Sequence, residues 1–398
     1  MPGGSLAFKE ASRPEIIPLA WQITTEPPDS PDFYTAVIRP HVVEGGRSAF
    51  ISGPPGVGKS WVLKKLKEEL EEKGETVKVI SLTHVAARNV NGQTAHSFAH
   101  RFIQHGRYKG YLLIDEISMM CLPLLAALET LSLSGCRIIC FGDWDQLPPI
   151  NNTWRGNAVT PKLFKDSRLM KVWCESTMFV LTRCRRSDQE HFNWYTSIPR
   201  MTLQGAKEEA RERLPPNGYR ADWNLVISHN RRIKLNDLLQ KAATEAYKTN
   251  MDTTLIVHVE PFPQIPESEV NTRCLMRNVP QAFDCWPGTH LIGVDNEHKK
   301  VVNGALLEVM DIDSSICVEG GKGIFIRDRE TDEEFSMSIA QIAKHTRLCW
   351  AVTYPAVQGR TLDGTVRLWD VDSKHFTLEA LYIGVSRARH GSLVSLAS

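Results

Sequence analysis

Short apolar runs alternate with stretches of helical spacing along the first half of the chain. Runs rich in Val, Ile and Leu are typical of buried strands, whereas apolar positions three or four residues apart are typical of helices that bury one face. The alternation favours a parallel sheet with helices on both of its faces. We expect strands at 48–52, 76–82, 111–115 and 137–143, and helices at 61–73 and 122–133.

The second half repeats this alternation, but a block of short strands interrupts it. A strand at 224–230 precedes a helix that we expect to reach Leu239. Short alternating runs broken by Gly and Asn then predict a small β-rich insertion at about 289–345. Runs at 347–354 and 365–371, and the segment LYIGVSRAR near the end of the sequence, return to the α/β pattern.

These patterns divide the chain into three parts. Residues 1–34 are rich in Pro and are expected to form an extended lead-in. Residues 35–178 form a first α/β domain, and residues 179–398 form a second one that contains the β-rich insertion. No internal repeat of fixed period and no low-complexity tract is visible in the sequence.

The composition is that of a globular protein. Of 398 residues, 42% are hydrophobic and 23% are charged, and the net charge is only +1. Since the whole chain is not basic, a polyanion would have to be bound by local clusters of positive charge. The candidate clusters are Arg183, Arg185 and Arg186, and Arg231 with Arg232.

The sequence predicts an intracellular protein that is not secreted. Its nine Cys form no C-x-x-C pair, which argues against a disulfide framework or a zinc site. It contains no apolar run of about 18 residues, the length that a membrane span needs. The first residues also lack the basic-then-apolar pattern of a signal peptide.

The segment GPPGVGKS follows a predicted strand and opens a predicted helix, which is the context of a phosphate-binding loop. Its glycines let backbone N–H groups curl around a phosphate, and the helix dipole strengthens the attraction. Lys59 is expected to reach the β- and γ-phosphates of ATP, and the Ser60 hydroxyl to bind Mg²⁺. The nucleotide-binding residues are Gly53, Pro54, Pro55, Gly56, Val57, Gly58, Lys59 and Ser60.

Two acidic residues, Asp115 and Glu116, end the apolar run YLLI. Asp115 would complete the metal site with Ser60, and Glu116 would act as the general base for an attacking water. A hydrolase needs this second acid, whereas a protein that only binds nucleotide does not. The simpler interpretation is that both acids cap a turn at the end of a strand.

Gln146 follows the strand at 137–143, within the segment FGDWDQLPP. Its amide can donate and accept, so it can contact the γ-phosphate or the attacking water. Phosphoryl transfer also needs cations that spread the developing negative charge, and Arg186 and Arg387 are the candidates. Because both arginines lie in the second predicted domain, at 179–398, two domains would have to close on one ATP, as in a stepping motor.

These motifs resemble the superfamily 1 DNA helicases of the RecD/Pif-like branch, whose usual direction is 5′ to 3′. The chain is similar to the compact members encoded by large DNA viruses and mobile elements, and the resemblance covers about residues 35–398. Eight segments follow in family order: GPPGVGKS, SLTHVAARNVNGQTAHSF, LLIDEISMM, FGDWDQLPPI, LTRCRRSD, KKVVNGALLEV, WAVTYPAVQGRTLDG and LYIGVSRARH.

The resemblance implies a fold, a function and partners. The fold would be two RecA-like P-loop domains with ATP and Mg²⁺ between them and a small SH3-like insertion in the second domain. The function would be ATP-dependent translocation on single-stranded DNA and unwinding of tailed duplexes in replication, repair or recombination. The protein would act as a monomer in the cytosol, the nucleus or a viral replication site, with replication or repair proteins as partners.

The resemblance also implies contacts with nucleic acid, and it adds Gly359 to the nucleotide-binding residues. Phe98 and Trp144 are the expected base-stacking residues, since an aromatic face grips any base at ~1–3 kcal/mol, whereas Trp350 is expected in the core. The implied nucleic-acid contacts are Thr83, His96, Phe98, Trp144, Pro148, Thr353 and Gln358.

Some questions stay open at this point. The arginine segment is one residue shorter than the family pattern, so either Arg185 or Arg186 is the charge-stabilising residue. The loop at 355–359 lacks the usual basic side chain, and Gln22 is a weak candidate for adenine recognition. Two alternative functions remain: an RNA helicase of the same superfamily, and an ATPase switch that is stimulated by nucleic acid but does not unwind it.

Overall fold

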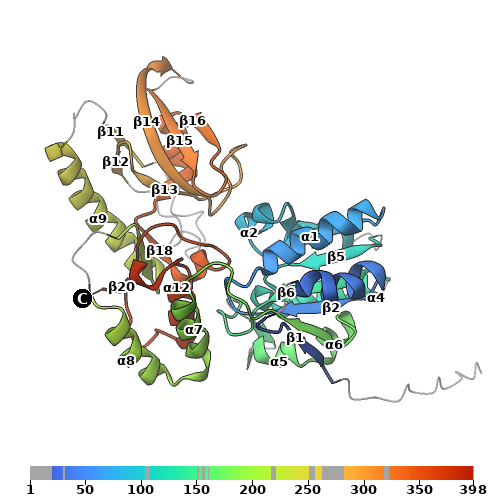
Figure 1. Ribbon diagram of the computed structural model, residues 1–398. Coiled ribbons are helices and arrows are strands. Elements are labelled where there is room, and N and C mark those ends of the chain that lie inside the picture. Colours follow the sequence, from blue (N-terminus) through green and yellow to red (C-terminus); the bar gives the residue numbers. More distant parts are fainter. Residues whose placement is uncertain are drawn as a thin grey trace, which may run out of the picture.

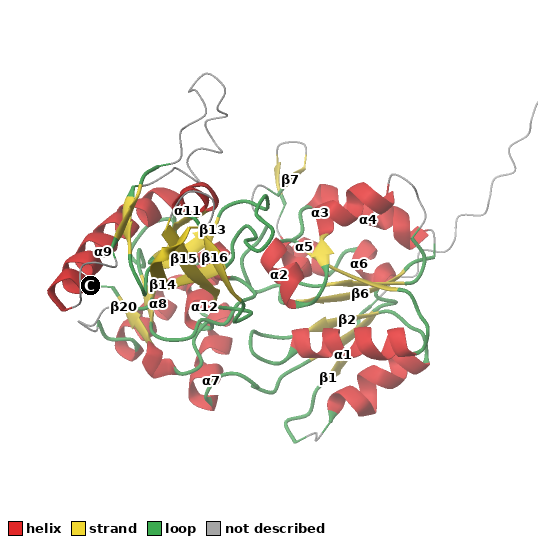
Figure 2. Cartoon of the chain, turned by 90° about the horizontal axis from the view of Figure 1, so that it is seen from above, coloured by secondary structure: helices red, strands yellow, loops and turns green. Residues whose placement is uncertain are grey.

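The computed structural model describes residues 20–397, except for 30–31, 104–107, 134, 150–151, 155–156, 160, 217–220, 251–255, 262–281 and 318–321. Two bodies lie side by side in both views, with the N-terminal half in one and the C-terminal half in the other (Figures 1 and 2). Residues 1–19 of the expected lead-in lie outside the described residues.

The first domain is built on a parallel sheet whose described strands are all parallel to their neighbours. In spatial order the strands are β1 (Gln22–Thr25), β9 (Thr177–Val180), β2 (Ala49–Ser52), β6 (Arg137–Gly142), β5 (Tyr111–Ile114), β3 (Val77–Ser81) and β4 (Gln93–Thr94). The helices are α1 (Lys59–Glu72), α2 (His84–Asn89), α3 (Ala95–Phe98), α4 (Leu122–Leu133), α5 (Pro161–Lys165) and α6 (Arg168–Trp173), and a small hairpin pairs β7 (Thr153–Trp154) with β8 (Asn157–Ala158).

Alternate residues of each central strand enter two different cores, as the sheet pleat requires. Ile51 of β2 packs in one core with Leu63 and Leu66 of α1. Its neighbour Phe50 packs in the other core with Leu128 of α4. The predicted parallel sheet with helices on both faces is therefore confirmed.

The second domain has a smaller parallel sheet and a long helix that carries the insertion. In spatial order its strands are β18 (Ala351–Thr353), β10 (Trp223–Val226), β19 (Val366–Leu368) and β20 (Val394–Leu396). Its helices are α7 (Gln189–Ser197), α8 (Leu203–Arg213), α9 (His229–Asn250) and α12 (Leu378–Val385). The helix after β10 is longer than predicted, since α9 continues beyond Leu239 to Asn250 and packs against the insertion.

The insertion is an antiparallel sheet at the opposite end of the second domain from α7 and α8 (Figure 1). In spatial order its strands are β16 (Glu334–Met337), β15 (Lys322–Asp328), β14 (Leu306–Cys317), β13 (His290–Gly293) and β17 (Thr346–Leu348). A separate pair, β11 (Val257–Val259) and β12 (Phe283–Cys285), lies beside it together with α11 (Ile339–His345). The β-rich insertion predicted at about 289–345 is thus an antiparallel sheet whose strands extend from His290 to Leu348.

The first domain begins earlier and ends later than the sequence predicted. Strand β1 lies within the expected lead-in, but it pairs with β9 at the edge of the first sheet. Strand β9 in turn runs past residue 178, the predicted boundary. The segment QITT of β1 has no buried residue, so no hydrophobic pattern marks it as a strand.

Stacked aromatic rings connect the insertion to the second domain. The His290 ring of β13 stacks on Trp350 at 4.6 Å between centroids and on Trp223 of β10 at 5.7 Å. Trp286 extends the column on the other side of Trp350, and the Arg329 guanidinium lies 4.5 Å from the centre of the Trp223 ring. Trp350 is 3% exposed, so its predicted place in the core is confirmed. Insertion and second domain thus share one packed junction.

An ionic clasp joins the insertion to the first domain, formed by Arg88, Asp328, Glu330 and Arg360. Arg88 of α2 lies 2.7 Å from the Asp328 carboxylate and 3.5 Å from that of Glu330. Glu330 in turn lies 3.4 Å from Arg360, which donates a 2.7 Å hydrogen bond to the carbonyl of Gly304. The clasp therefore links three parts of the chain: α2, the turn after β15 and the loop that precedes β19.

Replacing Arg88 by Ala should destabilise the protein, because the buried Asp328 carboxylate loses a counter-ion. Arg88 is itself a quarter exposed, so we expect a loss of roughly 1–3 kcal/mol, below the value for a fully buried pair. Urea unfolding followed by circular dichroism measures the loss. Lys67→Ala is the matched control, since it removes an exposed ion pair within α1 and should cost about 0.3–0.5 kcal/mol. Equal losses in the two variants would contradict the clasp.

Candidate nucleotide site and nucleic-acid groove

The loop at 53–60 connects β2 to α1 at the carboxyl edge of the first sheet. Gly56 and Gly58 have φ angles of +86° and +94°, which L side chains rarely adopt. A Cβ at Gly56 would lie 3.1 Å from the Tyr195 hydroxyl, and one at Gly58 would lie 3.0 Å from Arg185 Cδ. Glycines are therefore required both by the backbone conformation and by the close approach of Arg185 and Tyr195.

Lys59 begins α1 and is buried beneath this loop. Its Nζ donates to the carbonyls of Gly53 and Pro54 at 2.6 and 3.0 Å. Burial lowers the pKa of Lys59, and the nearby carboxylates of Asp143, Glu116 and Asp115 oppose that shift. The loop thus positions the ammonium group among three acids, at the place where phosphates would lie.

Asp115 and Glu116 follow β5, and both are buried. Burial raises the pKa of Asp115 to about 7, with a smaller contribution from the charge of Glu116, and burial also raises the pKa of Glu116. The Glu116 N–H donates to Asp115 Oδ1 at 3.1 Å, while Glu116 Oε2 has no hydrogen-bond partner among the described residues. A buried carboxylate with a raised pKa can accept a proton, as a general base must.

Lys59 and Glu116, but not Asp115, line a cavity of about 420 Å³ to which both domains contribute. A Cβ at Gly359 of the second domain would lie 3.5 Å from Glu116 Oε1, so the two domains meet directly at this acid. Trp61 of α1 also lines the cavity and is 52% exposed, although the sequence did not single it out. The lining residues are Pro55, Gly56, Gly58, Lys59, Ser60, Trp61, Glu116, Gln146, Arg185, Arg186, Gly359, Thr361 and Arg387.

Arg186 and Arg387 are both held by Ser386. Arg186 donates to the Ser386 carbonyl and, at 3.2 Å, to Thr361 Oγ1. Arg387 donates to Ser386 Oγ at 2.8 Å and to three backbone carbonyls, and it is 1% exposed. Burial lowers the pKa of both, to about 9 for Arg387, and the nearby charge of Arg186 lowers the pKa of Arg387 further.

Arg185 has a different environment from Arg186. Its side chain is 47% exposed and lies 3.1 Å from the buried carboxylate of Glu26, which also accepts N–H bonds from Thr182 and Arg183. Arg185 is thereby tied to the edge of the first domain. Gln22, the candidate for adenine recognition, is exposed on β1 and does not line the cavity.

A second cavity, of about 540 Å³, lies between both domains and the insertion. Thr83 caps α2 by accepting the Ala86 N–H at 3.1 Å, and the same kind of cap at Thr94 places the exposed His96 on α3. Arg232 of α9, from one of the predicted basic clusters, also lines it. Five predicted nucleic-acid contacts line this groove: Thr83, His96, Pro148, Thr353 and Gln358.

The prediction that Phe98 and Trp144 stack on bases was wrong. Phe98 is fully buried, with its ring 4.8 Å from that of Phe102. Trp144 is 7% exposed and packs against Phe50, 6.1 Å away between ring centroids. Both belong to the core beneath α4, where no base can reach them. The motif places their backbone beside the groove, but their apolar rings turn into the domain.

Sequence reasoning missed Asp143, Tyr195 and Tyr382. Asp143 directly follows β6 and accepts a 2.8 Å hydrogen bond from the Tyr382 hydroxyl of α12. Tyr195 of α7 donates to the Pro55 carbonyl of the phosphate loop, also at 2.8 Å. An acid at the end of a strand, three residues before Gln146, was a visible signal for Asp143. No local signal predicts which tyrosines reach across the domain interface.

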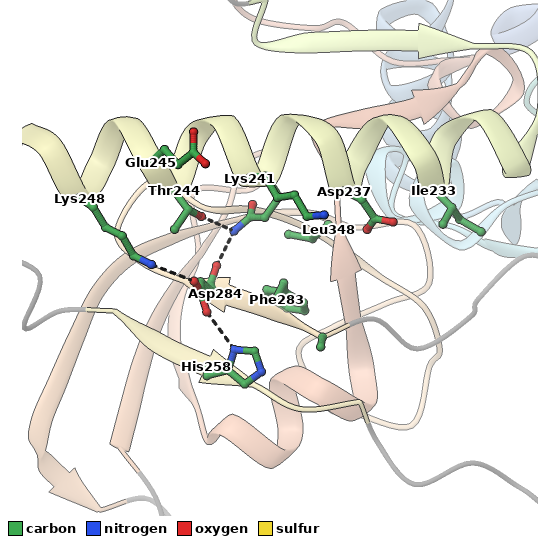
Figure 3. Close-up of a pocket in the computed structure, with 12 residues that line it drawn as sticks. Ile233, Asp237, Lys241, Thr244, Glu245, Lys248, His258, Phe283, Asp284 and Leu348 are labelled. Atoms are coloured by element: carbon green, nitrogen blue, oxygen red, sulfur yellow. Dashed lines mark hydrogen bonds and ion pairs between the residues drawn. The ribbon is translucent and has the colours of Figure 1, made fainter.

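A third cavity, of about 600 Å³, lies between α9 and the β11–β12 pair and contains none of the predicted site residues (Figure 3). Three of its side chains, Lys248, His258 and Asp284, form ion pairs with one another. Asp284 lies 2.9 Å from His258 and 3.6 Å from Lys248, as the dashed lines of Figure 3 show. The sequence motifs therefore gather at the other two cavities.

A phosphate loop, two buried acids and paired arginines, set between two parallel sheets, define a P-loop NTPase with two RecA-like domains. Residues 35–165 match the family described as AAA domain. The ATP-dependent DNA helicase PIF1 of Saccharomyces cerevisiae is 30% identical over 328 residues, which are 70% of this chain and 36% of that protein. The chain therefore belongs to the Pif1/RecD-like family of superfamily 1.

Solved structures agree with this fold. The Pif1 helicase from Candida albicans has a TM-score of 0.66 and 18% identity, covering 93% of this chain and 94% of that one. The structure of Bacteroides Pif1 bound to ssDNA has a TM-score of 0.59 and 18% identity, covering 92% of both chains. The chain spans less than two thirds of the length of the first curated relatives that it matches.

Proposed function

We propose that the protein is an ATP-dependent DNA helicase that moves on single-stranded DNA from 5′ to 3′ and unwinds tailed duplexes. One observation carries the proposal: the nucleotide cavity and the groove lie at the same interface and meet at two consecutive residues. Gln358 lines the groove, and the next residue, Gly359, lines the nucleotide cavity beside Glu116. A movement of the chain at the nucleotide cavity would therefore also move the lining of the groove.

ATP hydrolysis follows from the groups that surround the nucleotide cavity. Glu116 takes the proton of the attacking water, while Lys59 neutralises the phosphates as the bond to the γ-phosphoryl group breaks. Arg186 and Arg387, both in the cavity wall, stabilise the charge that develops in the transition state. We assign the charge-stabilising role to Arg186 rather than Arg185, because Arg185 is half exposed and paired with Glu26.

The site also fits Mg²⁺ bound together with the nucleotide. The described residues contain no cluster of three or more His, Cys, Asp or Glu that would hold a metal by themselves. Mg²⁺ is commonly bound by one or two protein groups and by substrate phosphates. Ser60 at the start of α1 and the buried Asp115 would be those groups, and the ion would supply charge neutralisation at the phosphates.

The groove is suited to a strand of any sequence. Its lining combines apolar groups with hydroxyl, imidazole and amide groups and the guanidinium of Arg232, so it offers contacts to the backbone of a strand rather than a pattern for one base order. Among relatives of known structure, the Bacteroides Pif1 was solved bound to ssDNA, and another Pif1 structure concerns unwinding at forked dsDNA. These neighbours support single-stranded and forked DNA as the partners here.

The proposal is tested by steady-state ATP hydrolysis at fixed low salt, without polymer, with single-stranded DNA and with single-stranded RNA. Strong stimulation by DNA is expected, and loss of activity on chelation of Mg²⁺ should accompany it. Unwinding of 5′-tailed but not 3′-tailed duplexes would then establish the direction. Stimulation by RNA alone would identify an RNA helicase, and stimulation without unwinding would identify an ATPase switch.

Replacing Gln358 by Ala should uncouple the two sites. Both polar atoms of its side chain are buried without a hydrogen-bond partner among the described residues, which is costly unless a ligand satisfies them. We expect stimulation of ATP hydrolysis by DNA to fall roughly tenfold, with basal hydrolysis within about twofold of the wild type, as for a coupling of 1–3 kcal/mol. The exposed Gln204 of α8 provides the control variant Gln204→Ala, and equal effects of the two changes would contradict the coupling.

An intracellular monomer that works beside replication or repair proteins remains part of the proposal. None of the helices that the structure describes has the length and apolar character needed to cross a bilayer. Sedimentation of the protein with and without DNA would test the monomeric state.

A further inference from the structure

Asp143 is a meeting point of the two domains inside the nucleotide site. It is 6% exposed and directly follows β6. Its Oδ1 accepts the Asp145 N–H at 3.0 Å, and its Oδ2 lies 2.8 Å from the Tyr382 hydroxyl and 3.4 Å from Gln146 Nε2. One carboxylate therefore contacts a residue of its own domain's active site and a residue of the other domain.

Tyr382 reaches Asp143 from α12, the helix that precedes Arg387. It lies on α12, which ends at Val385, directly before Ser386 and Arg387. Tyr382 is 2% exposed, and burial, together with the Asp143 charge, raises the pKa of its hydroxyl well above the usual value. Tyr382 therefore stays protonated and donates its hydrogen bond, and that bond exists only while the two domains are closed.

The acceptor at Asp143 determines how the Gln146 amide is turned. An ionised carboxylate accepts hydrogen bonds only, so the NH₂ group of Gln146 must face it. The carbonyl oxygen then faces away from Asp143, and Gln146 Oε1 is buried with no partner among the described residues. Since Gln146 lines the nucleotide cavity with Lys59 and Glu116, this oxygen is available to accept a hydrogen bond from a water held there.

We propose that Tyr382 is a positioning residue for hydrolysis, which fixes Gln146 through Asp143 with its carbonyl oxygen toward the attacking water when the domains close. The proposal rests on the proposed ATPase function. Arg387 would then be placed and Gln146 oriented at the same time, because both depend on the position of α12. With the domains apart, Asp143 loses one of its donors and Gln146 is free to turn.

The test is Tyr382→Phe, which removes the hydroxyl and keeps the ring. We expect DNA-stimulated kcat to fall roughly ten- to a hundredfold, the size of effect that misplacement of a reacting group has, while the KM for ATP stays within about twofold. Gln146→Ala should lower kcat as well, and the double variant should be no slower than the worse single one. The two effects should not add, because Tyr382 acts on hydrolysis through Gln146.

Tyr195→Phe is the matched control. It also removes a 2.8 Å hydrogen bond between the domains, to the Pro55 carbonyl, but it does not touch Asp143. Its effect should multiply with that of Gln146→Ala. Two results would overturn the proposal: an unchanged kcat in Tyr382→Phe, or effects of Tyr382→Phe and Gln146→Ala that multiply in the double variant. In either case the bond between Tyr382 and Asp143 would be a structural contact only. Wild-type protein that does not hydrolyse ATP would instead overturn the proposed function.

Discussion

Replacing Glu116 by Gln should stop ATP turnover while leaving ATP and DNA bound. Gln keeps the size and polarity of Glu but cannot take a proton from water. Because a positioned base contributes about 10²–10⁴-fold, kcat should fall by at least that range. The binding groups remain intact, since Lys59 is held by the carbonyls of Gly53 and Pro54 rather than by Glu116.

Phosphate release measures turnover, and a fluorescent ATP analogue and labelled single-stranded DNA measure binding. Lys59→Ala should lose turnover as well, but together with tight nucleotide binding, which separates the two roles. The exposed Glu129 of α4 supplies the control Glu129→Gln, which should behave like the wild type. Turnover that survives in Glu116→Gln would remove Glu116 from the role of base.

Replacing Arg186 by Ala should lower kcat by about 10³-fold, the lower end of what a charge-stabilising arginine contributes to phosphoryl transfer. Arg186 is suited to this role because its Nε has no partner among the described residues, while its two remaining nitrogens are anchored on Thr361 and Ser386. It is therefore held in place and still has a donor for phosphate oxygens. Single-turnover hydrolysis measures the loss apart from product release.

Arg185→Ala is the matched control for Arg186→Ala, since both residues line the nucleotide cavity. The Arg185 guanidinium forms an ion pair with Glu26. Removing the Arg185 side chain should therefore change kcat by only a few fold. Arg387 is less useful as a test, because four hydrogen bonds tie it to the second domain and its removal would disturb that fold. A larger effect in Arg185→Ala than in Arg186→Ala would exchange the two roles.

The elements that the sequence predicted well are those with a local signal. The apolar run at 48–52 became β2, and GPPGVGKS became a loop before α1, because burial and backbone geometry act over a few residues. Strand β1 was missed, since its four exposed residues carry no apolar pattern. The length of α9 was underestimated, because its last turns are stabilised by packing against the insertion rather than by their own periodicity.

Within the candidate site, the predictions failed for residues whose role depends on whether the side chain points into the groove or into the core. Phe98 and Trp144 lie in motifs that border the groove, yet burial of their rings in the core outweighs exposure to a base. The bond between Asp143 and Tyr382 joins residues 239 positions apart, which no pattern along one sequence encodes. The positions of the phosphate-loop residues could be predicted, because their chemistry requires all of them to face one ligand.

The aromatic column has a mechanical consequence. Because Trp223, His290 and Trp350 stack across the junction, we expect the insertion to move together with the second domain, as a lever arm would. The ion pairs of Arg88 with Asp328 and Glu330 lie at the far contact of that lever, so every parting of the domains has to break them.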